Sequence, residues 1–481
     1  MAKLHPSDPA FQNYQKERIH HWDQVAIKMD QWQSLGKYYV RRLTKIYQFL
    51  IPPDKRVLEL GCGLGDLLAE LKPSYGLGVD FSPEMVARAK QRHPELDFMV
   101  CDAHVLACEQ EPFDFILLSD LVNDLWDMQA LLEGLHPFCH SGTRLILNYH
   151  SRLWELPLSI TRKLGLAKPE KLQNWLTPDD VDNLLYLSGF ETIRSWREIL
   201  FPLPLPLIAP FINQFIARIW PFNYLTMTSF TLGRFQPQQQ LEEKRVSVIV
   251  PARNEAGNIQ EIFDRVPEMG TGTELIFVEG NSTDHTYAEI ERVMAANPGR
   301  DVHLFKQPGV GKGDAVRLGF EKATGDILMI LDADITVPPE DLPVFYEALV
   351  SGKGEFINGV RLVYPMEQEA MRFLNLLGNK FFSIVFSWLL GQPIKDTLCG
   401  TKVLWKNDYQ DIVANREYFG NFDPFGDFDL IFGAAKLNRK IIDLPIRYRE
   451  RTYGSTNIHR WRHGLLLLRM VGIAARRLKF I

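Results

Sequence analysis

The stretch "MILDADITV" (329–337) decides how the second half of the chain folds, because an apolar strand pattern runs directly into two carboxylates. Asp332 and Asp334 are one residue apart, and side chains at i and i+2 of a strand share a face. If the strand stays extended, the carboxylates point the same way, roughly 7 Å apart. Such a pair repels unless a cation such as Mg²⁺ or Mn²⁺ binds it. An isolated D-x-D is more often a solvated turn, so its surroundings must decide.

Three other segments accompany this stretch in a fixed order. "VSVIVPARNEAGNI" (246–259) and "ELIFVEGNSTDHT" (274–286) are strands followed by polar turns, and "GVGKGDAVRLGF" (309–320) places Lys312 in a Gly-rich turn before a helix. Acidic strand ends can bind a base and a ribose, and a lysine in a Gly-rich turn can contact a diphosphate. The D-x-D can then hold a metal ion against that diphosphate. The four segments together indicate this site far more specifically than any one of them.

Residues from about 246 to 460 resemble family 2 glycosyltransferases with the GT-A fold, especially the polyprenyl-phosphate mannose or glucose synthases. The resemblance implies an inverting glycosyltransferase that uses a GDP- or UDP-linked sugar, with Mg²⁺ or Mn²⁺ held by Asp332 and Asp334. Glu279 stands where the family usually has Asp. The residues that the resemblance assigns to nucleotide-sugar binding are Pro251, Ala252, Asn254, Glu255, Glu279, Asn281, Asp284 and Lys312.

The acceptor side of this half follows from two later segments. "IKDTLCGTKVL" (394–404) resembles a segment of the same branch and implies acceptor contacts by Asp396 and Lys402, with Lys402 in place of Arg. Arg451 matches the family's R-x-x-G turn, although residues 455–457 depart from the usual E-S-K. A lipid phosphate acceptor needs such cations for positioning. A hydroxyl acceptor needs a general base instead, for which we expect Asp429 or Asp427.

The first half of the chain carries a different pattern. "VLELGCGLGDLLAEL" (57–71) is a strand, a Gly-rich turn and a helix start, in which glycines allow close approach to a ligand. Asp80 ends the next strand, where an acid can accept hydrogen bonds from ribose hydroxyls. Asp102 follows a third strand in "FMVCDAHVL" (98–106). The composite indicates a nucleoside-like cofactor. A dehydrogenase fingerprint does not fit, because position 66 is Asp rather than Gly or Ala.

Residues from about 20 to 200 resemble class I S-adenosylmethionine-dependent methyltransferases, which implies a Rossmann-like sheet and S-adenosyl-L-methionine as cofactor. The cofactor-binding residues that we expect are Glu59, Gly61, Gly63, Gly65, Asp80, Asp102, Ala103 and Ser119. The resemblance also places Asp120, Asn123 and Asp124 at the site. His150 is either a general base or a structural histidine. The alternative for this half is a non-catalytic binding or scaffolding module.

The chain has 481 residues, 46% hydrophobic and 23% charged, with a formal net charge of −5 that gives no bulk reason to bind nucleic acid. Five cysteines without a C-x-x-C pair favour reduced cytosolic thiols. We expect an α/β methyltransferase domain at 1–232 (core about 20–200, apolar Pro-rich extension 199–232), a linker at 233–245 and an α/β glycosyltransferase domain at 246–481. This fusion indicates a bifunctional enzyme of cell-envelope glycan or glycolipid synthesis.

Three apolar segments bear on membrane contact. "ILFPLPLPLIAPFI" (199–212) carries four prolines that prevent a regular helix. Residues 371–391 form a helix pattern with a wide apolar face, and the tail 458–481 has six Lys and Arg and no acid. A basic amphipathic helix suits an anionic lipid surface. With no apolar run of about 18 residues and no signal core, we expect a peripheral protein at the cytoplasmic face of the membrane, with a lipid-linked acceptor.

Overall fold

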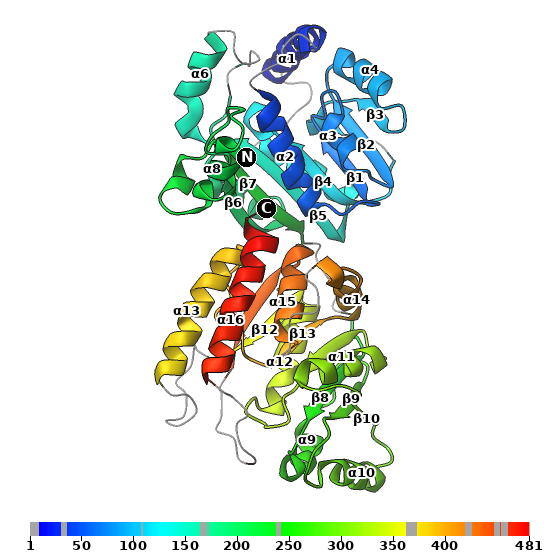
Figure 1. Ribbon diagram of the computed structural model, residues 1–481. Helices are drawn as coiled ribbons and strands as arrows, with labels where there is room; N and C mark the ends of the chain where they lie inside the picture. The colour runs from blue at the N-terminus through cyan, green and yellow to red at the C-terminus, as the bar shows by residue number, and fades with distance from the viewer. Residues whose placement is uncertain are drawn as a thin grey trace. The chain divides into compact units, whose positions relative to one another are not determined.

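The computed structural model describes residues 9–29, 36–106, 109–163, 171, 173–236, 242–361, 373–418, 426–446, 453 and 460–480. The chain divides into two compact units, Met1–Gln238 and Gln239–Ile481. Each unit is built around one seven-stranded sheet with helices packed on it (Figure 1). The prediction of two successive α/β sheet domains is confirmed.

The first unit has the strand order β3-β2-β1-β4-β5-β7-β6. All neighbours are parallel except β7, which runs antiparallel to β5 and β6. Val57 and Leu58 are adjacent on β1 yet belong to different core clusters, so helices and loops cover both faces. The strands are β1 Arg56–Leu60, β2 Tyr75–Asp80, β3 Asp97–Val100, β4 Phe113–Ser119, β5 Cys139–His150, β6 Phe190–Glu198 and β7 Thr228–Phe235. The helices are α1 Pro9–Lys28, α2 Gly36–Leu50, α3 Asp66–Glu70, α4 Pro83–Arg92, α5 Met128–Gly134, α6 Glu155–Lys163, α7 Pro178–Leu187 and α8 Ile208–Gln214.

Strand β7 corrects the expected start of the linker. The predicted extension at 199–232 supplies most of this strand, and Gly233–Phe235, predicted as the start of the linker, complete it. Because β7 lies between β5 and β6, all of its residues but the last are buried. Arg234 is nevertheless stable there, since its guanidinium contacts Glu191 on β6 at 2.6 Å. The polar, Gln-rich composition of residues 233–245 therefore led to a wrong prediction of where this interior strand ends.

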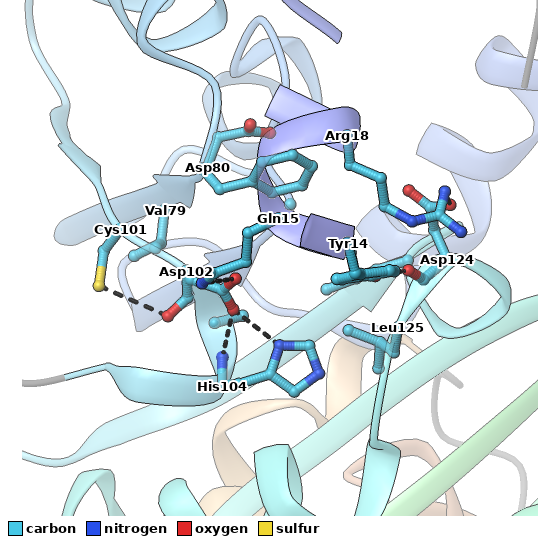
Figure 2. A pocket seen from close by; sticks show the side chains of 14 residues that line it. Tyr14, Gln15, Arg18, Val79, Asp80, Cys101, Asp102, His104, Asp124 and Leu125 are labelled. Atoms are coloured by element: carbon cyan, nitrogen blue, oxygen red, sulfur yellow. Dashed lines mark hydrogen bonds and ion pairs between the residues drawn. The ribbon is translucent and has the colours of Figure 1, made fainter. Parts of the chain in front are cut away.

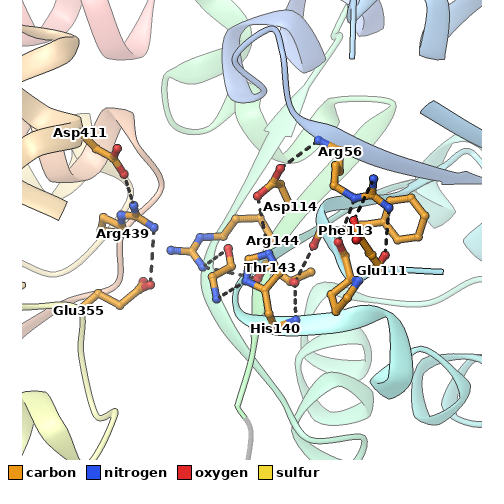
Figure 3. A network of polar contacts seen from close by, with 12 residues as sticks. Arg56, Glu111, Phe113, Asp114, His140, Thr143, Arg144, Glu355, Asp411 and Arg439 are labelled. Atoms are coloured by element: carbon orange, nitrogen blue, oxygen red, sulfur yellow. Dashed lines mark hydrogen bonds and ion pairs between the residues drawn. The ribbon is translucent and has the colours of Figure 1, made fainter. Parts of the chain in front are cut away.

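Polar contacts tie the strands of this sheet together at the edge where β1 and β4 begin (Figure 3). The Arg56 backbone N–H donates to Asp114 Oδ2 at 2.9 Å, and the Thr143 hydroxyl donates to the Phe113 carbonyl at 2.7 Å. His140 Nε2 lies 3.6 Å from Asp114 Oδ1. This edge is held by its own side chains, whereas the opposite edge carries the acids that the sequence singles out.

The second unit has the strand order β10-β9-β8-β11-β13-β12-β14, with β13 antiparallel to both of its neighbours. Its strands are β8 Val246–Ala252, β9 Thr273–Glu279, β10 Val302–Lys306, β11 Ile327–Ile330, β12 Phe356–Val360, β13 Lys402–Trp405 and β14 Ile441–Pro445. Its helices are α9 Ile259–Arg265, α10 Thr286–Ala296, α11 Lys312–Lys322, α12 Leu342–Val350, α13 Phe373–Leu390, α14 Lys406–Ala414, α15 Asp427–Lys436 and α16 Arg460–Ala474.

Helices α13 and α16 are the two amphipathic segments that the sequence predicts, and they pack against each other. On α16, Leu467 and Met470 are buried, whereas Leu465 and Leu468 are 72% and 53% exposed. Four consecutive apolar residues, 465–468, point to different sides of the helix. Only those that face α13 are buried by its packing. Within the described residues, none of the helices has the length and apolar character needed to cross a membrane.

Candidate active sites

The Gly-rich turn of the first unit follows β1. Gly61, Gly63 and Gly65 all have positive φ (68°, 52° and 75°), a conformation that side chains rarely tolerate. A Cβ on Gly61 would lie 2.9 Å from the Leu121 side chain, so the turn and the loop after β4 pack without space for one. The Gly63 N–H donates to Asp80 Oδ2 at 2.9 Å, which fixes the turn against the end of β2.

Two buried acids flank this turn. Glu59 is 3% exposed, and its Oε2 has no hydrogen-bond partner among the described residues. Burial raises the pKa of Glu59 to about 8. Burial likewise raises the pKa of Asp80 to about 6, although the N–H groups of Ser82 and Gly63 act in the opposite direction. A cationic group would relieve both, and S-adenosylmethionine carries an ammonium and a sulfonium.

Asp102 has more partners than the other two acids (Figure 2). Its Oδ1 accepts from the His104 backbone N–H at 2.9 Å and pairs with His104 Nδ1 at 2.7 Å. Its Oδ2 accepts from Gln15 Nε2 at 2.6 Å. Burial alone would raise the pKa of Asp102, but the hydrogen bonds from His104 and Gln15 outweigh it and lower that pKa. Ala103 lines the same pocket as Gly61, Asp80 and Asp102.

Helix α1 fills the centre of this pocket. Tyr14, Gln15 and Arg18 line it, and the remaining cavity is about 20 Å³, space for about one water molecule. Small-molecule sites usually span roughly 300–1,000 Å³. Arg18 forms an ion pair with Asp124, and Trp22 Nε1 donates to the same carboxylate at 3.1 Å. These α1 residues could not be predicted from the sequence, because they belong to no motif.

A polar cluster lies beyond Ser119, where β4 ends. Asp120 has a positive φ of 54°, and its Oδ1 accepts from the Tyr39 hydroxyl at 2.7 Å and from Asn148 Nδ2 at 2.5 Å. The His150 ring lies 5.9 Å from the Tyr39 ring, centroid to centroid. The His150 N–H donates to Asn123 Oδ1 at 2.8 Å, so the Asn123 amide holds the backbone there. Tyr39 thus contacts both Asp120 and His150. Asp124 instead lines the pocket that contains the α1 side chains.

In the second unit, β11 ends at Ile330, before the paired acids. Asp332 and Asp334 therefore lie in a turn, which the Ile335 N–H closes by donating to the Asp332 carbonyl, and the expectation of one shared strand face is wrong. Asp334 Oδ1 accepts from the Thr336 hydroxyl at 2.7 Å. Asp332 Oδ1 instead contacts Lys312 Nζ at 2.6 Å. The two carboxylates therefore have different partners.

Lys312 and Asp332 form the centre of this second site. Burial would lower the pKa of Lys312, but the carboxylates of Asp332 and Asp427 outweigh it and raise that pKa. Burial would raise the pKa of Asp332, and Lys312 reverses that shift. A Cβ on Gly400 would lie 1.9 Å from Asp332 Oδ2 and 2.4 Å from Lys312 Nζ. The segment 394–404 therefore contacts Asp332 and Lys312 through Gly400.

The two expected bases on α15 differ in their surroundings. Asp429 Oδ2 accepts from Arg416 Nε at 2.8 Å. Asp427 is 5% exposed, and its Oδ1 has no hydrogen-bond partner within the described residues, the nearest cation being Lys402 Nζ at 3.7 Å. Burial raises the pKa of Asp427 against the influence of Lys312 and Lys402. Asp427 therefore faces the Lys312–Asp332 pair, whereas Asp429 is committed to an arginine.

Two of the expected acceptor residues, Asp396 and Lys402, are bonded to other residues of the protein. Asp396 is 1% exposed and accepts from Arg361 Nε and Nη2 at 2.7 and 2.8 Å. This fork lowers the pKa of Asp396 although burial alone would raise it. Lys402 is fully buried and donates to the Cys399 carbonyl. Sequence reasoning missed Arg361, for which the only signal is a cation directly after β12. Arg451 lies outside the described residues.

Several of the expected nucleotide-sugar residues hold one another in place. Glu279 Oε1 accepts from the Ser282 N–H at 2.5 Å. Asn254 Oδ1 accepts from the Thr283 N–H at 2.8 Å, and Glu255 Oε2 accepts from Asn258 at 2.8 Å. Pro251 and Ala252 end β8, Asn281 is exposed, and Asp284 accepts from Thr286. The bond between Asn254 and Thr283 joins the turns after β8 and β9.

A separate group of possible metal ligands lies at the start of β9 and β10. Ligand atoms of Glu274, Asp301 and His303 lie within 4.8 Å of one another. Arg245 already pairs with Asp301, which opposes a further cation. Glu274 and Glu279 lie at opposite ends of β9, so this group is remote from Asp332.

Comparisons with known proteins agree with this division. A family model described as a methyltransferase domain matches residues 33–195, and one described as glycosyl transferase family 2 matches residues 247–403. A dolichol-phosphate mannosyltransferase of Pyrococcus furiosus is 28% identical over 220 residues, which are 44% of this chain and 59% of that protein. An undecaprenyl-phosphate 4-deoxy-4-formamido-L-arabinose transferase of Edwardsiella ictaluri is 36% identical over 228 residues, 46% of this chain and 64% of that protein.

The chain thus spans about three fifths of the length of these relatives. A solved mannosyltransferase of Pyrobaculum calidifontis, in complex with GDP-Man and Mn²⁺, is 22% identical with a TM-score of 0.36, covering 49% of this chain and 65% of that one. The predicted pair of domains is confirmed by the family matches. Residues 33–195 of this chain form a methyltransferase domain, and residues 247–403 belong to glycosyl transferase family 2.

Proposed function

We propose that the chain is a bifunctional transferase of glycolipid or cell-envelope glycan synthesis. Its C-terminal unit transfers a sugar from a GDP- or UDP-linked donor to a lipid-linked or polyprenyl-phosphate acceptor, and its N-terminal unit transfers a methyl group from S-adenosyl-L-methionine. We take the unit boundary to fall within 236–242. The observation that carries the sugar transfer is the approach of Lys312, Asp332, Gly400 and Asp427 to one another.

These residues fit a divalent cation and a nucleoside diphosphate. Asp332 already holds a cationic group at 2.6 Å, and Asp334 offers a second carboxylate two residues on. Mg²⁺ or Mn²⁺ bound there would neutralise the charge of the leaving diphosphate. Lys312 would then shift from Asp332 to a phosphate oxygen, and Asp427 would accept the proton of a hydroxyl acceptor. For a lipid phosphate, Lys402 and Arg361 contribute the positive charge that orients it.

Thermal melting with nucleotides tests the donor assignment. GDP-mannose, UDP-glucose and their diphosphates are added at saturating concentration with Mn²⁺, with Mg²⁺ and with chelator. Saturation at one hundred times Kd should stabilise the fold by about 2.7 kcal/mol. The shift should require the metal and should vanish in Asp332→Asn. The assignment is wrong if no nucleotide gives a metal-dependent shift.

The methyltransferase assignment is carried by Glu59, Asp80 and Asp102, which follow one another at the ends of neighbouring strands around Gly61. The small cavity favours the alternative of a scaffolding module, because a cofactor enters only if α1 side chains move. Calorimetry with S-adenosylhomocysteine decides between the two. Binding that is lost in Asp80→Asn supports the methyltransferase, and no heat at millimolar ligand supports the scaffold.

Peripheral attachment to the cytoplasmic membrane face rests on α13 and α16. Phe381, Ile384 and Trp388 of α13 are 54%, 72% and 40% exposed, and α16 adds Leu465 and Leu468. Arg469, Arg476 and Arg477 are exposed on the same C-terminal segment. Apolar side chains among cations suit an anionic lipid interface. Sedimentation with anionic vesicles should capture the full chain, and Leu465→Ser/Leu468→Ser should weaken that binding.

A further inference from the structure

The methyltransferase unit exposes large apolar side chains on two segments far from α16 in sequence. Leu153, Leu156 and Ile160 are 62%, 75% and 57% exposed along residues 152–163, at the spacing of one helix side. Eleven more such side chains lie within 203–225, of which Leu207 and Trp220 are 86% and 75% exposed. We call the exposed hydrophobic residues of 153–160 and 203–225 the apolar surface. Soluble proteins rarely expose contiguous apolar patches beyond a few hundred Å².

The two segments are joined and held in shape. Trp154 Nε1 donates to the Leu225 carbonyl at 2.8 Å, and α6 and α8 lie on the same side of the sheet (Figure 1). The Asn213 side chain is buried, accepts from the Leu200 and Phe201 N–H groups at 2.8 Å each, and donates to the Phe201 carbonyl at 2.7 Å. The Asn213 amide therefore holds the backbone at the beginning of the Pro-rich stretch. The exposed side chains of this stretch are thus carried by an ordered backbone.

The charges around the apolar surface indicate whether it binds a bilayer or a protein partner. Residues 199–228 contain no Asp or Glu, and their single cation, Arg218, is paired with Glu198 at 2.8 Å. Residues 152–163 carry Arg152, Arg162 and Lys163 against one acid. An apolar centre with Trp and Tyr, bordered by cations, matches the headgroup region of an anionic bilayer. A protein partner would need about one hydrogen bond per 100–200 Å², and the exposed apolar side chains offer few donors.

The apolar surface borders the polar cluster around Asp120. The Ser151 N–H donates to the Met227 carbonyl at 2.8 Å, which links η5 (Arg152–Trp154) to the segment after Leu225. Thr228 then donates to the Tyr39 hydroxyl at 3.3 Å, and that hydroxyl donates to Asp120. Asn213 also donates to the hydroxyl of Tyr38, the neighbour of Tyr39, at 3.0 Å. A molecule lying in the bilayer beside this surface would reach the Asp120 side of the sheet first.

We propose that the apolar surface seats the methyltransferase unit in the headgroup region of a bilayer and that the methyl acceptor is a molecule held in that membrane. The second clause rests on the methyltransferase function proposed above, whereas the first does not. Attachment through this surface is independent of α16, because the residues lie in the other unit.

Vesicle binding of the full-length chain tests the seating. In the background Leu465→Ser/Leu468→Ser, the triple variant Leu156→Ser/Leu207→Ser/Trp220→Ser should lower partitioning into phosphatidylcholine–phosphatidylglycerol vesicles by about tenfold or more. The matched control Tyr186→Ser/Leu187→Ser removes side chains that are 79% and 52% exposed on α7 and should leave binding unchanged. Brominated lipid should quench tryptophan fluorescence less in Trp220→Phe than in the parent.

Two outcomes would overturn the seating. If the triple variant and its parent partition equally into vesicles, the apolar surface does not bind the bilayer. If the triple variant instead converts an oligomer into a monomer in light scattering while vesicle binding persists, the surface is a protein interface.

A labelling experiment tests the acceptor class. The full chain is incubated with S-[methyl-³H]adenosylmethionine and vesicles of a bacterial membrane lipid extract. Label should enter the organic phase, and the triple variant should reduce that label while binding S-adenosylhomocysteine as the parent does, since none of its three positions lines the cofactor pocket. Label confined to water-soluble products would overturn the acceptor class. A parent that binds no S-adenosylhomocysteine would overturn the methyltransferase function but leave the vesicle result standing.

Discussion

Gln15 Nε2 donates a 2.6 Å hydrogen bond to Asp102 Oδ2, so a helix that precedes the recognisable methyltransferase sequence occupies the acid expected to meet the cofactor's adenine. Tyr14 and Arg18 line the same pocket, in which a cavity of about 20 Å³ remains. Helix α1 therefore competes with any ligand for the polar groups of the pocket.

Replacing Gln15 should make cofactor binding easier. A hydrogen bond to a charged group contributes about 1.5–3 kcal/mol, so its loss from the ligand-free protein should lower the Kd for S-adenosylhomocysteine by about tenfold or more. Calorimetry on Gln15→Ala measures the change. Gln24→Ala is the control, since Gln24 is exposed on the same helix and bonds to His20. Weaker binding by Gln15→Ala would mean that Gln15 contacts the ligand instead.

Glu59 should make stability depend on pH. Its pKa is about 8 in the folded protein and close to 4.5 when unfolded, so between these values the folded state holds a proton that the unfolded chain has released. The free energy of unfolding should therefore fall as pH rises through this window, by about 1.4 kcal/mol per pH unit from this group. Urea unfolding at pH 5.5, 6.5 and 7.5 measures the slope, and Glu59→Gln should flatten it. An equal slope in both proteins would refute the assignment.

The two acids of α15 should differ in function. Asp427→Asn should reduce sugar transfer to a hydroxyl acceptor about a hundredfold or more, because it removes the carboxylate that faces Lys312. Asp429→Asn should mainly weaken the pair with Arg416 and cost about 1 kcal/mol of stability. Donor hydrolysis, product formation and urea unfolding separate the effects. Full activity of Asp427→Asn would exclude it as the base.

Lys402 should not tolerate replacement by arginine. Its side chain is fully buried beside Cys399 and Asp427, so a larger guanidinium should overpack the site and cost about 1–3 kcal/mol. Urea unfolding of Lys402→Arg measures this, with Lys395→Arg at an exposed position as control. A more stable and more active Lys402→Arg would show that the site has room for a bidentate phosphate contact.

The acids at the strand ends could be predicted because they depend on local pattern alone. Neighbouring parallel strands finish at the same edge of a sheet, so Glu59, Asp80 and Asp102 had to lie near one another once their strands were recognised. The same logic brought the turns after β8 and β9 together. The two expected domains follow from this periodicity of strands and helices.

Other features depended on contacts between distant residues, which no local pattern encodes. Asp332 and Asp334 have different partners, Lys312 and Thr336, and Arg234 on the buried strand β7 is paired with Glu191. The sequence alone determined which residues carry charge and the order in which strands and helices alternate. Only the tertiary structure decided which charges are paired, because Arg361, Arg416 and Gln15 reach their carboxylates across 13 to 87 residues of chain, and burial makes each pairing strong.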